Sequence, residues 1–290
     1  MTTQSHDRRQ GKALIAPMAA ILIAMLAFPL LVDIVYSLSR VTFETLRAPS
    51  LEGLTNYRAA FADPGFWAAA WFSFRFGLLT ALAQVALGLF LAIFLAPLID
   101  RRPWLMAPLM LPMMVAPALV GLMYRLVLHE FIGPVPYYLL LWTGDSPSFL
   151  GAGNAFRTLV VVEILQWTPF SLLILYAAYK AIPEDVREAA RIDGAGVFDM
   201  LRRIELPLLL PTLAMTFFMR FIAGFRVFDN VYTLTGSGAG GSTTSLSIYI
   251  YLAFFKEGAI GKAVAASVIL LVASFVFIVV LDRLSRRRDA

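Results

Sequence analysis

The sequence predicts an all-α membrane protein with six transmembrane helices, and three observations carry that prediction. The composition is apolar: 60% of the 290 residues are hydrophobic and 15% are charged, whereas soluble domains average about 45–50% and about 25%. Several apolar runs are long enough to cross the core of a bilayer, which takes about 20 residues. Lysine and arginine gather at alternate ends of those runs, as they do in multi-pass membrane proteins.

Six apolar runs are the candidate spans. They are Ala13–Val32, Phe76–Ile99, Trp104–Tyr124, Thr158–Tyr179, Leu206–Met219 and Ala263–Leu281. The fourth run is interrupted only by Glu163, and the short fifth run continues through Arg220 to Arg226. We expect the first run to remain as an uncleaved span, because it is longer than the roughly 7–15 apolar residues of a signal peptide.

The distribution of basic residues predicts the orientation. With a cytoplasmic N-terminus, the inner segments are the two tails, Arg101–Arg102 and residues 180–203, and they hold 14 lysines and arginines. The opposite segments, residues 40–69, 129–156 and 227–262, hold 5. Basic residues favour the cytoplasmic side, so we expect both termini in the cytoplasm.

A charged stretch, residues 181–207, lies on the predicted cytoplasmic side between the fourth and fifth spans. Pro183 followed by Glu184 and Asp185 favours a helix start. Glycines at 194 and 196 then allow a turn between two short amphipathic helices. The expected apolar faces comprise Val186, Ala189 and Ala190 in the first helix and Val197, Leu201 and Ile204 in the second. Such a pair of helices is typical of a surface that docks on a membrane or a partner protein.

The spacing of Glu188-Ala189-Ala190, Gly194, Ile204 and Leu206-Pro207 resembles the EAA loop of permeases in ATP-binding-cassette (ABC) importers. Residues 53–73, 101–135 and 228–255 resemble other segments of carbohydrate-type permeases, so the likeness covers nearly the whole chain. The run FDNVYTLTG (228–236) is similar to the maltose-type first subunit of a two-permease pair. This resemblance implies a type I ABC importer permease fold. It also implies a division into residues 1–64 (cytoplasmic tail, first span and periplasmic segment) and a permease core over 65–290.

The resemblance assigns a role to the 181–207 loop, which in that family inserts into a cleft on a cytoplasmic ATPase. The residues expected to couple to the ATPase are Glu188, Ala189, Ala190, Gly194, Leu201, Ile204 and Pro207. Glu188 is the candidate for a charge-assisted bond to the ATPase, and Gly194 for the sharp turn. Leu201 and Ile204 are expected to supply packing.

The same resemblance places substrate-lining positions on the fourth and fifth spans. They are Gln166, Trp167 and Phe170 on the fourth span, and Arg220, Ala223, Gly224 and Val227 on the fifth. Among these positions, aromatic rings can stack on a sugar and polar side chains can bind its hydroxyls. The positions therefore suit a sugar or sugar derivative as the substrate. Ionisable residues inside spans are functional hypotheses. Arg220 among mostly uncharged positions therefore favours an anionic sugar derivative, and Glu163 is a candidate partner for an arginine.

The sequence contains no sign of catalysis or of a metal site. There are no cysteines and two histidines, His6 and His129. The nearest match to a phosphate-binding loop, Gly258–Ala263, lacks the required glycine spacing and the final Ser/Thr. We therefore expect no cofactor in this chain, with ATP and magnesium bound by a separate ATPase. The basic residues are explained by topology, so no nucleic acid partner is expected.

The expected assembly is a multi-pass complex in a bacterial cytoplasmic membrane, in contact with lipid. Its other members would be a second related permease, two copies of an ATPase subunit and a periplasmic or lipid-anchored substrate-binding protein. A secondary transporter or channel is the alternative, and it would contain inverted repeats and no coupling motif. A membrane-embedded enzyme is a third possibility, and it would need a cluster of carboxylates at the membrane surface.

Overall fold

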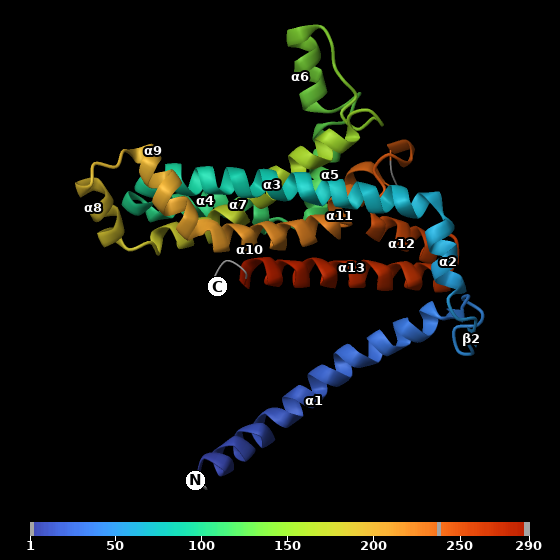
Figure 1. The fold of residues 1–290 in the computed structure, drawn as a ribbon. Helices are drawn as coiled ribbons and strands as arrows, with labels where there is room; N and C mark the ends of the chain where they lie inside the picture. Colours follow the sequence, from blue (N-terminus) through green and yellow to red (C-terminus); the bar gives the residue numbers. More distant parts are fainter. Residues whose placement is uncertain (1–2, 237–238, 287–290) are drawn as a thin grey trace. The chain divides into compact units, whose positions relative to one another are not determined.

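The computed structural model describes the backbone of residues 3–236 and 239–286, and side chains within 16–236, 239 and 241–279. Helices make up most of the described chain (Figure 1). By contacts, the chain groups into two units. The basic side chains of both tails, on which the orientation prediction partly rests, lie outside the described ones. The orientation and the division at residue 64 stay predictions.

The first unit comprises residues 1–64 and 250–272. Its elements are α1 (Thr3–Ser37), the antiparallel strands β1 (Ser39–Arg40) and β2 (Ser50–Leu51), α2 (Thr55–Ala62), and parts of α12 (Leu246–Phe255) and α13 (Ile260–Arg286). The Asn56 amide nitrogen donates to the carbonyls of Ser37 and Ser39, at 3.0 and 2.8 Å. Lys262 pairs with Asp63 at 2.6 Å. These bonds tie the end of α1 to α2, and α2 to the start of α13.

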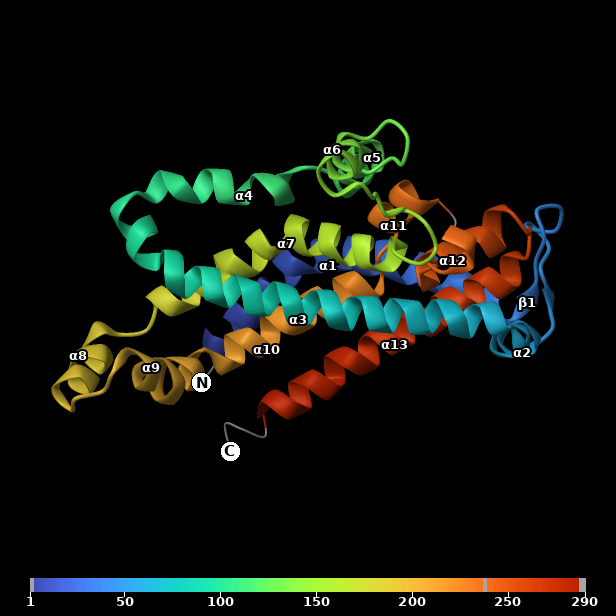
Figure 2. The ribbon, with the colours of Figure 1, turned by 90° about the horizontal axis from the view of Figure 1, so that it is seen from above.

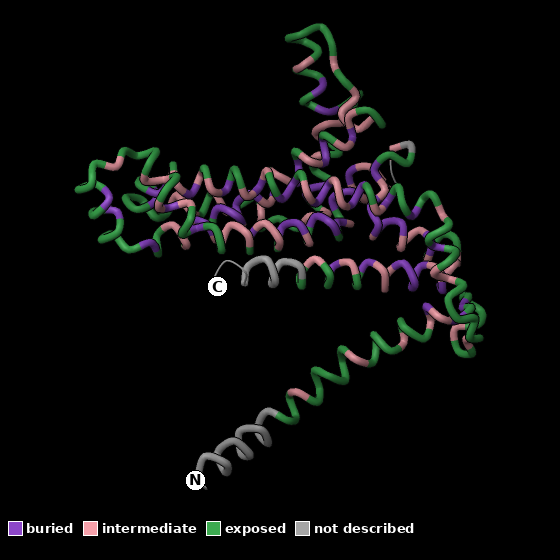
Figure 3. The backbone as a smooth tube through the Cα atoms, in the orientation of Figure 1, coloured by how far each residue is buried: buried purple, intermediate pink, exposed green. Residues whose placement is uncertain are grey.

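The second unit comprises residues 65–249 and 273–290. Its elements are α3 (Pro64–Arg101), η1 (Pro103–Leu105), α4 (Met106–Met114), α5 (Pro117–Val127), α6 (Pro134–Thr143), α7 (Ala155–Lys180), α8 (Glu184–Ile192), α9 (Val197–Met200), η2 (Leu201–Glu205), α10 (Leu206–Phe225), α11 (Asp229–Thr235) and η3 (Ala239–Gly241), with the remainder of α12 and α13. Buried residues concentrate in α3, α7 and α10, whereas α6 and the α8–α9 loop are largely exposed (Figure 3).

The predicted all-α membrane architecture is confirmed. Five helical segments of the described chain are long and apolar enough to cross a bilayer: Ala16–Ser37, Pro64–Arg101, Ala155–Lys180, Val197–Phe225 and Ile260–Val279. A bent helix pair makes a sixth if it is counted as one span. Two boundaries differ from the prediction. The second span begins at Pro64 rather than Phe76. The second helix of the charged loop is also not a separate helix, because α9, the π-helical η2 and α10 run on continuously into the fifth span.

The third predicted span, Trp104–Tyr124, is not one continuous helix. Residues Pro103–Met114 and Pro117–Val127 instead form two helical segments bent by 83° at Val115 and Ala116. Proline has no N–H to donate and pushes the preceding residue into an extended conformation. Ala116, which precedes Pro117, accordingly has ψ 133°, and Val115 before it is also extended, with ψ 134°. In Figure 2, α4 lies in the plane of the view and α5 is seen end-on.

Small residues bring the long helices of the second unit close together. A Cβ built on Gly224 of α10 would lie 2.9 Å from the Cα of Gly77 on α3. A Cβ on Gly88 would lie 2.6 Å from the Cβ of Ser171 on α7. Close backbone approach through small residues is a common way for helices to associate in a membrane. It brings the polar side chains of α3, α7 and α10 within reach of one another.

Candidate functional site

A network of polar side chains lies buried among the helices of the second unit. It joins Gln84 of α3, Glu163 and Gln166 of α7, Arg220 of α10 and Asn230 of α11, and each is at most 5% exposed. Arg220 Nε donates to Gln84 Oε1 at 2.7 Å, and Arg220 Nη2 lies 3.3 Å from Glu163 Oε1. Gln84 Nε2 donates in turn to the backbone carbonyl of Glu163, at 3.0 Å. The charge on Arg220 is therefore matched and hydrogen-bonded, as burial of an ion requires.

The network continues to the break in the third span. Asn230 Nδ2 donates to Glu163 Oε2 at 2.7 Å and to Gln166 Oε1 at 2.8 Å. Gln166 Nε2 donates to the carbonyl of Val115, at 3.1 Å. That carbonyl stands at the bend, where the helical bonding pattern is interrupted. A free carbonyl inside a membrane costs several kcal/mol, so Gln166 stabilises the broken helix.

Two aromatic rings lie against the Arg220 guanidinium. Its Cζ is 4.5 Å from the centroid of Trp167 and 5.6 Å from that of Phe170. Both rings belong to α7, one turn apart on the face that carries Glu163. A guanidinium over an aromatic face is attracted by the ring's electron density. Arg220 is thus held by charge, hydrogen bonds and stacking together.

A cavity of about 210 Å³ opens beside this network. It is lined by Pro117, Glu163, Trp167, Arg220, Ala223, Arg226, Val227, Phe228, Asp229 and Asn230. Small-molecule sites usually enclose about 300–1,000 Å³. The cavity therefore has the size of part of a substrate site, and its polar lining comes from α7, α10 and α11.

The structure places the predicted substrate residues in different surroundings. Trp167, Arg220 and Val227 line the cavity, as does Ala223. The Gln166 side chain is hydrogen-bonded to the Val115 carbonyl and to Asn230. Phe170 lies against Arg220, and Gly224 packs against Gly77. The structure thus brings four of the seven to the cavity, and their role in binding substrate stays a prediction.

The prediction of an anionic substrate placed Arg220 among mostly uncharged positions. The structure adds three charged side chains to these surroundings, because Glu163 pairs with Arg220 and the cavity also contains Arg226 and Asp229. Sequence reasoning missed Gln84, Arg226, Asp229 and Asn230 as members of the site. A lone glutamine in the otherwise uncharged run Phe76–Ile99 was the available signal for Gln84.

Two further arginines, one in α3 and one in α5, have local contacts. The Arg75 guanidinium lies 4.1 Å from the ring centroid of Phe156, and Arg125 donates to the carbonyl of Thr233 at 3.4 Å. Glu163 was expected to pair with an arginine, and Arg220 is that partner. Within the described residues, no group of three or more His, Cys, Asp or Glu side chains is arranged to hold a metal ion.

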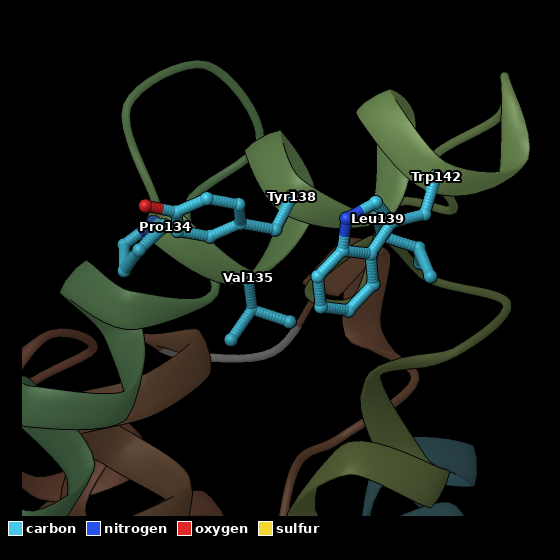
Figure 4. A pocket seen from close by; sticks show the side chains of 5 residues that line it. All are labelled: Pro134, Val135, Tyr138, Leu139 and Trp142. Carbon is cyan, nitrogen blue, oxygen red and sulfur yellow. The ribbon is translucent and has the colours of Figure 1, made fainter.

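A larger hollow, about 410 Å³, lies along α6 (Figure 4). Its lining consists of Pro134, Val135, Tyr138, Leu139 and Trp142, all from this one helix. A single exposed helix does not enclose a ligand, and these side chains offer no charged group. The hollow is therefore not the candidate site.

Helix α8 in the charged loop is fixed by Arg187. Its Nε lies 2.9 Å from Glu205 Oε1 and its Nη1 lies 3.3 Å from Glu184 Oε2. Its Nη2 donates to the carbonyl of Tyr179 at 2.9 Å, and its Cζ lies 4.4 Å from the Tyr179 ring centroid. Burial disfavours the charge of Arg187, but hydrogen bonds to Glu205 and Glu184 outweigh it and raise the pKa of the guanidinium above its ordinary value.

The apolar face predicted for docking, Val186, Ala189 and Ala190, is mostly exposed in α8. Arg187 and Ala190 are buried, whereas Val186 and Ala189 are exposed. Of the other predicted coupling residues, Leu201 and Ile204 are half-buried and the rest are exposed, namely Glu188, Gly194 and Pro207. Sequence reasoning missed Arg187, although the sequence places it between two acids that could pair with it, Glu184 and Glu205.

The tip of the loop exposes large apolar side chains. Ile192 is 86% exposed, Val197 is 89% exposed and Phe198 is 70% exposed. Gly194 between them has φ +80°, a conformation that glycine adopts readily and other residues avoid. The expected turn at Gly194 is therefore present, and it leaves an apolar tip open to a partner.

Comparisons with known proteins agree over almost the whole chain. Residues 65–290 match the family described as binding-protein-dependent transport system inner membrane component. The trehalose/maltose transport system permease protein MalF of Thermococcus litoralis is 31% identical over 98% of this chain and 96% of its own length. The sulfoquinovosyl glycerol transport system permease protein SmoG of Agrobacterium fabrum is 30% identical over 98% and 92%.

Solved structures show the same fold. A chain of a bacterial alginate ABC transporter, crystallised with an alginate pentasaccharide-bound periplasmic protein, matches with a TM-score of 0.84 over 99% of this chain and 98% of that one, at 20% identity. A chain of the MetNI methionine ABC transporter in an inward-facing conformation matches with a TM-score of 0.56 over 78% and 98%, at 16% identity. The predicted type I ABC importer permease fold is therefore confirmed.

Proposed function

We propose, given that this chain belongs to the family of binding-protein-dependent transport system inner membrane components, that it is the permease subunit of an ABC importer that moves a sugar or sugar derivative into the cytoplasm. One observation carries the proposal: its relatives over nearly its full length are named as permeases for sugars or sugar derivatives, among them trehalose, maltose and sulfoquinovosyl glycerol. A polar cavity beside Trp167 supports the same substrate class.

The 181–207 loop is the surface on which a separate ATPase would dock. Its apolar tip of Ile192, Val197 and Phe198 suits insertion into a groove. Its base is held rigidly through Arg187. In this proposal the chain performs no chemistry itself and binds no cofactor, and the ATPase subunits bind ATP and magnesium.

The assembly we propose contains this chain, a second related permease, two ATPase copies and a substrate-binding protein outside a bacterial inner membrane. The family description makes a binding protein a partner. The small volume of the cavity supports a second permease that completes the site. A transporter that needs no ATPase, or a membrane-embedded enzyme, would leave the family match and the exposed loop tip unexplained.

The test is reconstitution of the whole complex in lipid, with ATP hydrolysis and uptake measured for trehalose, maltose, an alginate oligosaccharide and sulfoquinovosyl glycerol. We expect at least one of these sugars to stimulate ATP hydrolysis and to be taken up. A complex that hydrolyses ATP but responds to none of the four contradicts the sugar assignment.

A separate experiment tests whether the ATPase docks on the 181–207 loop. Phe198→Asp should abolish co-purification of the ATPase, because it places a charge on the apolar tip. Leu51→Asp is the matched control, since Leu51 is 76% exposed and lies in β2, outside the loop. Retention of the ATPase by Phe198→Asp, at the level of Leu51→Asp, contradicts the loop's assignment.

A further inference from the structure

The four charged side chains that line the cavity fall into two groups. Glu163 and Arg220 are buried and paired with each other. Arg226 and Asp229 are exposed, and neither side chain has a hydrogen-bond or ion-pair partner among the described residues. Arg226 directly follows α10 as its C-terminal cap, and Asp229 is the first residue of α11. A free donor and a free acceptor therefore stand three residues apart at the lining of one cavity.

Asn230 adds a second free acceptor. Its Nδ2 donates to Glu163 Oε2 and to Gln166 Oε1, so the nitrogen must face these two oxygens and the amide cannot be turned round. Its Oδ1 is buried and has no partner among the described residues. An unsatisfied buried acceptor is unfavourable, and Asn230 lines the cavity.

The free groups define the chemistry of the occupant. Arg226 offers only donors, whereas the Asp229 carboxylate and Asn230 Oδ1 offer only acceptors. A hydroxyl both donates and accepts, so a polyol satisfies all three. An anionic group can accept from Arg226, but it leaves the two acceptors unused and stands near the carboxylates of Asp229 and Glu163. The formal charges of the lining also cancel, with two carboxylates and two guanidinium groups.

We infer that this cavity takes an uncharged, polyhydroxylated part of the sugar, with Arg226, Asp229 and Asn230 binding its hydroxyls. Arg220 then acts as a positioning residue that holds Glu163 and the Trp167 ring, and not as a receptor for an anion. This inference rests on the proposed function and narrows it to sugars whose group in this cavity is neutral.

The experiment measures equilibrium binding of sugars to the permease–ATPase complex in lipid nanodiscs. The binding protein is left out, so that its own sugar specificity does not decide which sugar reaches the cavity. The probes are trehalose and maltose as neutral sugars, and sulfoquinovosyl glycerol and an alginate oligosaccharide as anionic ones. We expect a neutral sugar to bind, and Asp229→Asn or Arg226→Gln to weaken its binding about tenfold or more, as the loss of a hydrogen bond from a charged group does. Both positions are exposed, so these variants should fold.

Asn230→Ala tests the buried acceptor. The loss of sugar affinity that it causes should equal the loss caused by removing one hydroxyl from the sugar. Among the monodeoxy forms of the neutral sugar that binds, we expect one that binds the wild-type protein weakly. The affinity for that form should not fall further in Asn230→Ala. A structural role alone would weaken all sugars equally. The controls are Arg125→Gln and Asp145→Asn, which change exposed residues outside the cavity lining.

The outcomes separate this inference from the proposed function. Binding of the anionic sugars alone, lost in Arg226→Gln and unchanged or stronger in Asp229→Asn, overturns the inference and leaves the sugar permease intact. Neutral sugars that bind all three variants as well as the wild type also overturn it. Failure of all four sugars to bind overturns the inference and counts against the proposed function as well.

Discussion

The Nε atom of Arg187 lies 2.9 Å from Oε1 of Glu205, and both side chains are buried. Arg187 belongs to α8 and Glu205 is the last residue of η2, directly before α10. The pair therefore joins the charged loop to the start of the fifth span. The pair offers a path by which a movement of the loop would reach the span, as the proposed coupling to an ATPase requires.

Arg187→Ala should uncouple the loop from the fifth span. It leaves Glu205 buried without its cation, and breaking a buried pair costs about 3–5 kcal/mol. We expect a lower melting temperature and loss of substrate-stimulated ATP hydrolysis in the reconstituted complex. Arg191→Ala is the matched control, because Arg191 is exposed and its one ion pair among the described residues is with Glu184, a contact worth less than about 1 kcal/mol. Similar behaviour of the two variants would show that the buried pair has no special role.

The two glycines of the loop should differ in their tolerance of a side chain. Gly194 has φ +80° and Gly196 has φ −71°, and no atom stands within 4 Å of a Cβ built on either. Gly194→Ala should therefore cost about 1–2 kcal/mol through backbone strain alone, whereas Gly196→Ala should be nearly neutral. Thermal unfolding and ATPase binding of the two variants measure this difference, and equal losses would contradict it.

Much of the architecture was predictable because the bilayer forces it on the sequence. Apolar runs mark the spans, and the charged stretch between Tyr179 and Leu206 marks the loop, since neither pattern is stable in the other environment. The sequence did not decide which of two prolines breaks the third span. Pro112 and Pro117 were both visible, but only the structure shows that α4 runs through Pro112 and ends before Pro117.

The polar network was harder to predict than the spans. Glu163 and Arg220 are 57 residues apart and Gln84 and Arg220 are 136 apart, so no local pattern links them. Each lies in an apolar run, and periodicity does not say which helix faces which. Gly224 was assigned to the substrate for the same reason, because a small residue on a span suits either a cavity or a close helix contact.

Arg220 and Glu163 should behave as a coupled pair. Arg220→Ala and Glu163→Ala each leave one buried charge uncompensated and should each lower stability by about 3–5 kcal/mol. The double variant should cost less than the sum of the two, since it leaves neither charge behind. Thermal unfolding of the four proteins in the same detergent gives the coupling. Additive losses would mean that the 3.3 Å contact contributes nothing to stability.

Gly77 and Gly224 should tolerate no larger residue, because they form the crossing between α3 and α10. A Cβ on Gly77 would lie 2.8 Å from the backbone nitrogen of Phe225, and one on Gly224 would lie 2.9 Å from the Cα of Gly77. Backbone atoms cannot turn aside as a flexible side chain does, so the helices must separate. Separation would draw Arg220 away from Gln84, at 2.7 Å in the native structure.

Gly224→Val should therefore lower both the melting temperature and the amount of protein in the membrane, and the loss should persist in the absence of any sugar. Gly153→Ala is the control, because no atom lies within 4 Å of a Cβ at that position. If Gly224→Val instead kept full stability and lost only sugar binding, Gly224 would line the substrate path, as its place in the sequence first indicated. The two readouts, unfolding without ligand and binding with ligand, thus decide between a helix contact and a substrate contact at this position.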